Sequence, residues 1–276
     1  MPSSPYSYAQ RLMSDSDLAF VADGDVRTGN ALADLRHSLA TDEHFRAELL
    51  GSERLFRRVL NLDDALLRIS PRLFFEVLLR RSIYEIAHSP HVLERVGQDR
   101  VPLFLGDDEL RIVSQPVVID YLADLLASFT KIHSHTARVR VRRGVWRKSR
   151  YSDLDVPSLL RLASEAEGAE QQRVYKRAAD ASLLILGVFP DYATAAMRYP
   201  GTGTLRRRGG RLTTEEYEDV ASRAYKLAAE HPETEATQAE PMLMLSDHVI
   251  DAKRPLSRMA DQFLRFRRGS LFGMGS

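Results

Sequence analysis

The stretch SPRLFFEVLLRRSIYEIA, residues 70–87, decides the fold class of this chain. Its first residue, Ser70, suits the N-cap position, because a serine hydroxyl can accept a hydrogen bond from a backbone N–H that has no partner within the helix. Pro71 suits the first helical position, where the missing N–H of proline is not needed. Residues 73–79 are apolar on almost every side of a helix, which is typical of a helix at the centre of a bundle. The stretch therefore predicts a buried central helix.

Helical patterns continue on both sides of this stretch. Within residues 116–132 apolar residues recur every three or four positions and form one continuous stripe, made by Val118, Leu122, Leu125, Phe129 and Ile132. Helix starts are predicted at Thr41, at Asp155 and at Thr213, where Glu216 completes a capping box. The predicted fold class is mainly α, a multi-helix bundle or an orthogonal helical array of about ten helices with one or two small β-hairpins.

Two segments are predicted to form those hairpins. In residues 100–113, short apolar pieces flank the Gly-Asp-Asp sequence at 106–108, and Pro102 restricts the first strand to an edge position. In residues 138–150, basic and apolar residues alternate with a period of two, which favours a hairpin that turns near Gly144.

Composition divides the chain into four parts. Residues 1–29 are rich in Ser, Asp and Gly and predict a loosely ordered N-terminal arm, or a short helix that docks through Leu18, Phe20 and Val21. Residues 30–136 predict an N-terminal helical domain, 137–152 a basic hairpin or linker, and 153–276 a C-terminal helical domain. The sequence leaves open whether the two helical domains pack as one unit.

The overall composition is that of an ordinary globular protein. The 276 residues are 44% hydrophobic and 28% charged, with a formal net charge of +1, so no whole-protein field points to nucleic acid or to a membrane. Cysteine is absent, which excludes disulfides, thiolate metal sites and cysteine nucleophiles. The polar start does not resemble a secretory signal, and no apolar run approaches the roughly 20 residues of a membrane helix. We therefore expect a soluble, cytoplasmic protein.

The most informative local feature is the basic stretch RVRVRRGVWRKSR at residues 138–150. Seven of its thirteen residues are basic and none is acidic. Arginine pairs with phosphate groups, and Trp146 can stack on unpaired bases, so the stretch is a candidate nucleic-acid surface. The alternative is a solvated hairpin that meets the acidic N-terminal arm or an acidic partner.

A Gly-rich and Arg-rich loop, PGTGTLRRRGGRL at residues 200–212, is a second candidate. Backbone N–H groups and guanidinium groups can together hold a phosphate. The loop lacks the lysine and the Ser/Thr ending of a P-loop, so an ordinary surface loop is the favoured interpretation. The candidate residues for binding nucleic acid or an acidic partner are Arg138, Arg140, Arg142, Arg143, Trp146, Arg147, Lys148, Arg150, Arg206, Arg207 and Arg208.

Four histidines form two close pairs, His88 with His91 and His133 with His135. If their helices met, four imidazoles could gather around zinc or a similar metal. Histidine is also favourable at helix C-termini, and no H-E-x-x-H pattern is present. We therefore predict neither a metal site nor any other cofactor.

Methionine and leucine alternate at residues 242–245. Met242 and Met244 are candidates for an adaptable groove that receives a partner helix. The alternative is that they are part of the core.

Known catalytic motifs are missing: there is no G-x-S-x-G elbow and no set of kinase motifs. We therefore expect a non-catalytic helical interaction protein (an adaptor, scaffold or regulatory subunit) with a protein partner and without membrane association. One alternative is a nucleic-acid-binding protein that uses residues 138–150 and 206–211. A second is an enzyme whose helical pocket lacks a known motif. The sequence leaves homo-oligomerisation open.

Overall fold

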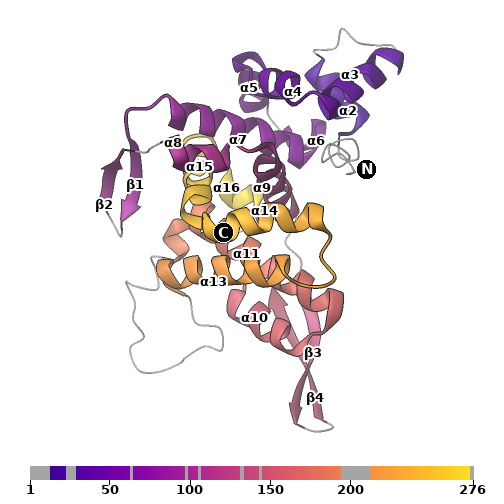
Figure 1. The fold of residues 1–276 in the computed structure, drawn as a ribbon, viewed down its shortest axis with the longest axis vertical. Helices are drawn as coiled ribbons and strands as arrows, with labels where there is room; N and C mark the ends of the chain where they lie inside the picture. Colours follow the sequence, from indigo (N-terminus) through magenta and orange to yellow (C-terminus); the bar gives the residue numbers. More distant parts are fainter. Residues whose placement is uncertain are drawn as a thin grey trace. The chain divides into compact units, whose positions relative to one another are not determined.

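The computed structural model describes residues 13–22, 29–62, 65–96, 99–104, 107–130, 134–142, 145–193 and 212–273 (Figure 1). It describes the backbone but not the side chains of residues 29–30, 92–96, 99–100, 107–109, 134–142 and 145–151. The chain is mostly helical, as predicted, and divides into two compact units. Unit 1 comprises Met1–Val92 and Leu103–Thr130, and unit 2 comprises Leu93–Pro102 and Lys131–Ser276.

Unit 1 is built around one central helix. Its helices are α2 (Asp15–Val21), α3 (Gly29–Thr41), α4 (Glu43–Leu50), α5 (Glu53–Leu60), α6 (Ala65–Arg68), α7 (Pro71–Ala87), α8 (Asp107–Val113) and α9 (Pro116–Ser128). Helix α7 packs against α9 and also contacts α4, α5, α6 and α8. Its residues from Arg72 to Arg80 are all buried. The Ser70 hydroxyl accepts a hydrogen bond from the N–H of Leu73 at 3.2 Å, so the predicted start and the predicted central position are both confirmed.

The predicted stripe of residues 116–132 is the buried side of α9. Val118, Leu122, Leu125 and Phe129 are each 1% exposed or less, and the helix packs on α7. The helix ends at Ser128, with Phe129 as its C-cap. Ile132 lies outside the described residues.

Of the two alternatives for the N-terminal residues, a short helix is present within residues 13–22, which contain α2. The Ser14 hydroxyl accepts from the N–H of Asp17, and the Asp17 carboxylate accepts from the N–H of Ser14, both at 3.1 Å. This capping box stabilises the helix start. Leu18 and Val21 are buried, so the helix is anchored by apolar packing. Residues 1–12 and 23–28 lie outside the described part.

The predicted hairpin of residues 100–113 is also wrong. Strand β1 (Val92–Val96) is hydrogen-bonded to β2 (Asp99–Leu103), and the residues after it form α8. The sequence Asp107-Asp108 begins that helix, where acidic residues interact favourably with the helix dipole. The carboxylates that we interpreted as part of a turn therefore start a helix.

The basic stretch lies on two paired strands of unit 2. Strand β3 (Ser134–Arg142) pairs antiparallel with β4 (Val145–Ser152), and the register shifts between Arg140 and Arg142. The connecting residues Arg143 and Gly144 lie outside the described part, so the turn near Gly144 stays a prediction. The two strands belong to unit 2 and begin before residue 137, where we predicted the linker to start.

The helices of unit 2 surround a second central helix. They are α10 (Val156–Glu165), α11 (Gly168–Val188), α13 (Thr214–Ala229), α14 (Ala236–Asp247), α15 (Val249–Gln262) and α16 (Arg268–Leu271). Helix α11 contacts α10, α13 and α15. A Cβ atom placed on Gly187 of α11 would lie 2.5 Å from the Cβ of Leu256 on α15. Glycine at this position therefore allows the two helices to approach closely.

The predicted helix starts agree with the structure except at one position. The Asp155 carboxylate accepts from the N–H of Ser158 at 3.2 Å, and the capping box of Thr213 and Glu216 is complete. Thr41, however, is the last residue of α3, and Asp42 is the residue that caps α4.

None of the helices in the described part of the chain has the length and hydropathy needed to cross a membrane.

Candidate functional sites

The register of β3 and β4 sorts the residues of the basic stretch between two faces. It pairs Arg138 with Lys148, Arg140 with Trp146, and Thr136 with Arg150. Directly paired residues lie on the same face of an antiparallel ladder, and the faces alternate along each strand. One face therefore carries four basic residues and the tryptophan: Arg138, Arg140, Trp146, Lys148 and Arg150. We call this set the basic face.

The remaining residues of the stretch are placed differently. Arg147 pairs with Val139 and lies on the opposite face, and Arg142 pairs with Val145 beyond the register shift. Arg143 lies outside the described residues, as do Arg206, Arg207 and Arg208 of the predicted loop. Phosphate binding by the loop stays a prediction.

The segment that contains the strand pair carries a high local positive charge. Residues 131–150 contain eight Lys and Arg and no Asp or Glu, out of 39 basic and 38 acidic residues in all. The net charge of +1 is therefore the sum of +8 in this segment and −7 in the rest of the chain. The net charge of the chain is nearly zero because one strongly basic segment offsets the acidic charge of the other residues.

The prediction of a partner groove is corrected, because Met242 is buried in the core. Met242 and Leu245 are 0% exposed, so their side chains belong to the core of unit 2 and do not line an open groove. Met244 is only partly exposed, and Leu243 is the exposed member of the segment. A helix presents successive residues to different sides, which is why a Met/Leu-rich run is divided between core and surface.

The histidines are not gathered at a metal site in the described residues. His88 and His91 are exposed, and Nδ1 of His88 is 2.8 Å from the backbone oxygen of Tyr84. His133 and the side chain of His135 lie outside the described part. Within that part, no group of three or more His, Asp or Glu side chains is placed to hold a metal ion.

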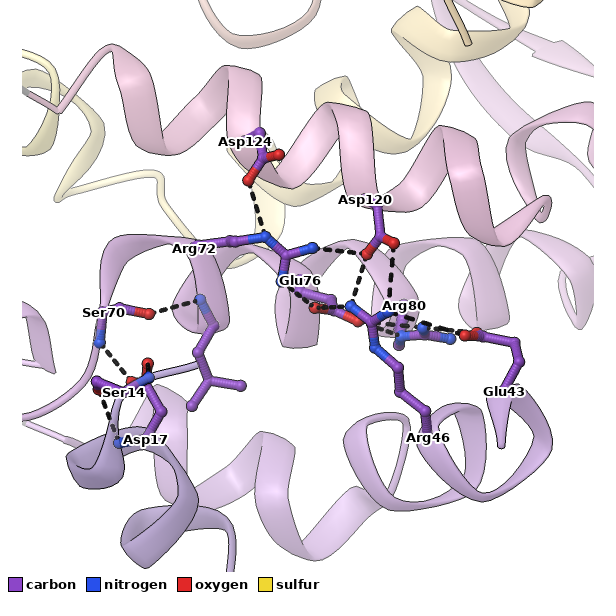
Figure 2. Close-up of polar contacts among 11 residues, drawn as sticks. Ser14, Asp17, Glu43, Arg46, Ser70, Arg72, Glu76, Arg80, Asp120 and Asp124 are labelled. Atoms are coloured by element: carbon purple, nitrogen blue, oxygen red, sulfur yellow. Dashed lines mark hydrogen bonds and ion pairs between the residues drawn. The ribbon is translucent and has the colours of Figure 1, made fainter. Parts of the chain in front are cut away.

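A cluster of buried charges joins three helices of unit 1 (Figure 2), and our sequence analysis did not predict it. Its members are Glu43 and Arg46 of α4, Arg72, Glu76 and Arg80 of α7, and Asp120 and Asp124 of α9. We call these residues the buried charge cluster.

Glu76 lies at the centre of the buried charge cluster and is fully buried. Its Oε2 atom accepts from Arg46 at 2.8 Å and from Arg72 at 3.0 Å. Its Oε1 atom accepts from Arg80 at 3.1 Å. Three guanidinium groups thus share one carboxylate, which offsets part of the large desolvation cost of burying charges.

The carboxylates of α9 and α4 complete the cluster. Asp120 accepts from Arg46 at 2.6 Å and from Arg72 at 2.7 Å, so it links the two arginines. Asp124 accepts from Nε of Arg72, and Glu43 accepts from Arg80, both at 2.8 Å. The ion pairs therefore connect α7 to α9 on one side and to α4 on the other.

The electrostatics of Glu76 favour its charged form. Burial by itself would raise the pKa of Glu76, but the positive charges of Arg46, Arg80 and Arg72 outweigh burial and lower the pKa to about 2. Burial likewise opposes the charged form of Arg46, yet Glu76 and Asp120 raise the pKa of Arg46 above its ordinary value. Glu76 is therefore ionised at neutral pH and is a weak base, which makes it unsuited to general acid–base catalysis. The geometry indicates that the cluster holds helices together.

One sequence signal could have revealed this cluster. Arg72, Glu76 and Arg80 are spaced four residues apart, so they lie along one side of their helix. Charged residues at this spacing within a helix that is otherwise apolar indicate buried ion pairs. The partners on α4 and α9 have no such signal, because they are distant in the sequence.

An exposed group of aromatic rings follows the end of α7. The ring of His88 stacks on Tyr84 with centroids 4.0 Å apart, and His91 meets Phe104 edge to face at 6.3 Å. Tyr84 is 53% exposed and Phe104 is 76% exposed. We call Tyr84, His88, His91 and Phe104 the aromatic surface.

Comparisons of the chain with models of known protein families, with curated proteins and with solved structures found no match.

Proposed function

We propose that this chain is a non-catalytic helical interaction protein that binds another protein through unit 1. The observation that carries the proposal is the aromatic surface. Its four rings lie close together in the sequence and are exposed, whereas aromatic side chains in a folded domain are more often covered. Aromatic residues are enriched where proteins bind one another, because they bury a large area with little loss of conformational freedom.

The buried charges of unit 1 support the same proposal. The carboxylates of the buried charge cluster accept hydrogen bonds from the guanidinium groups beside them. These paired charges stabilise the arrangement of the helices. Binding of a partner would therefore use other residues, which lie on the surface.

The experiment is a capture from the source cell with a double variant, Tyr84→Ser with Phe104→Ser. We expect the variant to lose a partner that the unchanged chain retains after nuclease treatment. The matched control is Leu227→Ser with Leu243→Ser, which removes two large exposed side chains from unit 2. Equal retention by both variants would contradict a role for the aromatic surface, and circular dichroism would verify that both remain folded.

Nucleic-acid binding is a second candidate function, and the distribution of charge favours it. The eight basic residues of 131–150 have no acidic residue among them. A segment of this charge attracts the phosphate backbone and releases its counterions, so binding should weaken strongly as salt is raised. The test is binding of the full chain to a labelled oligonucleotide at two salt concentrations.

A further inference from the structure

We propose that the basic face of β3 and β4 binds single-stranded nucleic acid, with cations along the phosphate backbone and Trp146 stacked on a base. This inference rests on the second candidate function and specifies its ligand and its residues. Arg138, Arg140, Lys148 and Arg150 supply the cations.

Positive charge is concentrated in one segment of the chain. The segment 131–150 carries +8, whereas the rest of the chain carries −7. In the described helices of unit 2, many basic side chains already lie beside acids of the same unit. Examples are Arg177 with Asp153 at 2.7 Å and Lys253 with Glu218 at 2.9 Å. The positive surplus therefore resides in the segment that contains the strand pair, and it predicts an anionic partner.

The register of β3 and β4 brings basic residues of both strands to one face. Alternation along one strand would place Arg138 and Arg140 on one face of any hairpin. The observed pairing adds Lys148, Arg150 and Trp146 from the second strand to that same face. A register shifted by one residue would have moved all three to the other face. The structure thus concentrates four basic residues and the tryptophan on one side.

The spacing of these residues suits a chain of phosphate groups. Alternate residues of a strand lie about 7 Å apart, which is close to the distance between successive phosphates of an extended single strand. Two adjacent strands, about 5 Å apart, provide two rows of cations. A chain of regularly spaced anions is therefore the ligand that fits.

Trp146 indicates which class of polyanion binds: a single strand, a duplex or an acidic peptide. Every base has a flat face that can stack on an indole ring, and unpaired bases expose that face whereas bases within a duplex do not. An acidic peptide would use the cations without needing the tryptophan. The position of Trp146 opposite Arg140 therefore favours a single strand over a duplex and over an acidic protein.

Intrinsic fluorescence provides a direct test, because Trp146 is the only tryptophan of the chain. The full chain would be titrated with an unlabelled thymidine oligonucleotide while tryptophan emission is recorded. We expect saturable quenching that weakens as salt is raised. Binding of a labelled oligonucleotide without any change in emission would overturn the proposed face while leaving nucleic-acid binding intact.

Two single variants test the register. Arg140→Gln lies on the basic face, and Arg147→Gln removes the same charge from the opposite face one residue from Trp146. We expect Arg140→Gln to weaken binding about tenfold and to lower the salt-dependence slope by about one, as loss of one phosphate contact does. We expect Arg147→Gln to change affinity less than about twofold. Equal losses in the two variants would overturn the assignment to one face.

Experiments with other polyanions distinguish the proposed single strand from a duplex and from an acidic protein. A duplex that quenches Trp146 as strongly as the single strand would overturn single-strand selectivity. Polyglutamate that displaces the oligonucleotide at equal charge concentration would overturn nucleic acid in favour of an acidic protein. If the chain binds no oligonucleotide at low salt, both this inference and the second candidate function are wrong.

Discussion

Nη2 of Arg46 lies 2.8 Å from Oε2 of Glu76, and both side chains are buried. The two residues come from α4 and α7, so this ion pair joins two helices inside unit 1 (Figure 2). Replacing a buried pair by well-packed apolar residues is often neutral or stabilising, whereas removing one partner leaves an unpaired buried charge. The predictions for this cluster follow from that asymmetry.

Glu76→Gln should destabilise the protein by about 3–5 kcal/mol, because three buried arginines would lose the carboxylate that they share. The measurement is the free energy of unfolding in urea. Asp219→Asn is the matched control, since Asp219 and its partner Arg223 are both largely exposed. Its effect should be within about 1 kcal/mol of zero. Similar losses in the two variants would contradict the proposed role of burial.

The stability of the protein should fall in acid because of Glu76. Its pKa is about 2 in the folded protein and 4.5 ordinarily, so the unfolded chain binds the proton more readily. The stabilisation is fully present above pH 4.5 and is lost as the pH falls towards 2. Unfolding curves between those values should show this decline in the unchanged chain and a weaker decline in Glu76→Gln. Parallel curves would show that other groups cause the acid sensitivity.

Asp17→Ala should cost about 1–3 kcal/mol, because it removes a buried carboxylate that accepts hydrogen bonds. Asp17 accepts from the N–H of Ser14 at 3.1 Å and from the N–H of Ser70 at 2.7 Å. It thereby ties the start of α2 to the N-cap of α7. We also expect faster proteolysis near α2. Asp15→Ala is the control, because Asp15 lies on the same helix with its side chain 81% exposed.

Gly187→Ala should destabilise unit 2 by about 1–3 kcal/mol through overpacking. The added Cβ would lie 2.5 Å from the Cβ of Leu256, so α11 and α15 would have to separate. The loss should be measured by thermal unfolding. In a background of Leu256→Gly the same change should cost less than it does alone, because the Cβ atom of Leu256 that restricts the space is absent. Additive losses would contradict the close approach.

Local signals predicted much of the fold. Ser70-Pro71 and the pair Thr213 and Glu216 each act within one helical turn, and both begin helices as expected. A local signal can nevertheless indicate the wrong helix boundary. Proline favours a helix boundary, but α15 runs from Val249 to Gln262 through the buried Pro255.

The candidate sites were less predictable than the helices. The alternation of the basic stretch indicated two faces, but it did not indicate which residues of the second strand would join Arg138 and Arg140. Met242 could be assigned to a groove or to the core from its sequence, and its burial decides for the core.

The sequence by itself determined the helical class, most helix starts and the basic character of residues 131–150, because these depend on residues within a few positions of one another. Only the tertiary structure decided that Arg46 meets Asp120, 74 residues away, that Arg72 and Arg80 of α7 are buried, and that the pairing of β3 with β4 places Trp146 on the same face as four basic residues. Contacts of this kind depend on which elements pack together. That choice is made by the free energy of the whole unit and has no counterpart in a local pattern.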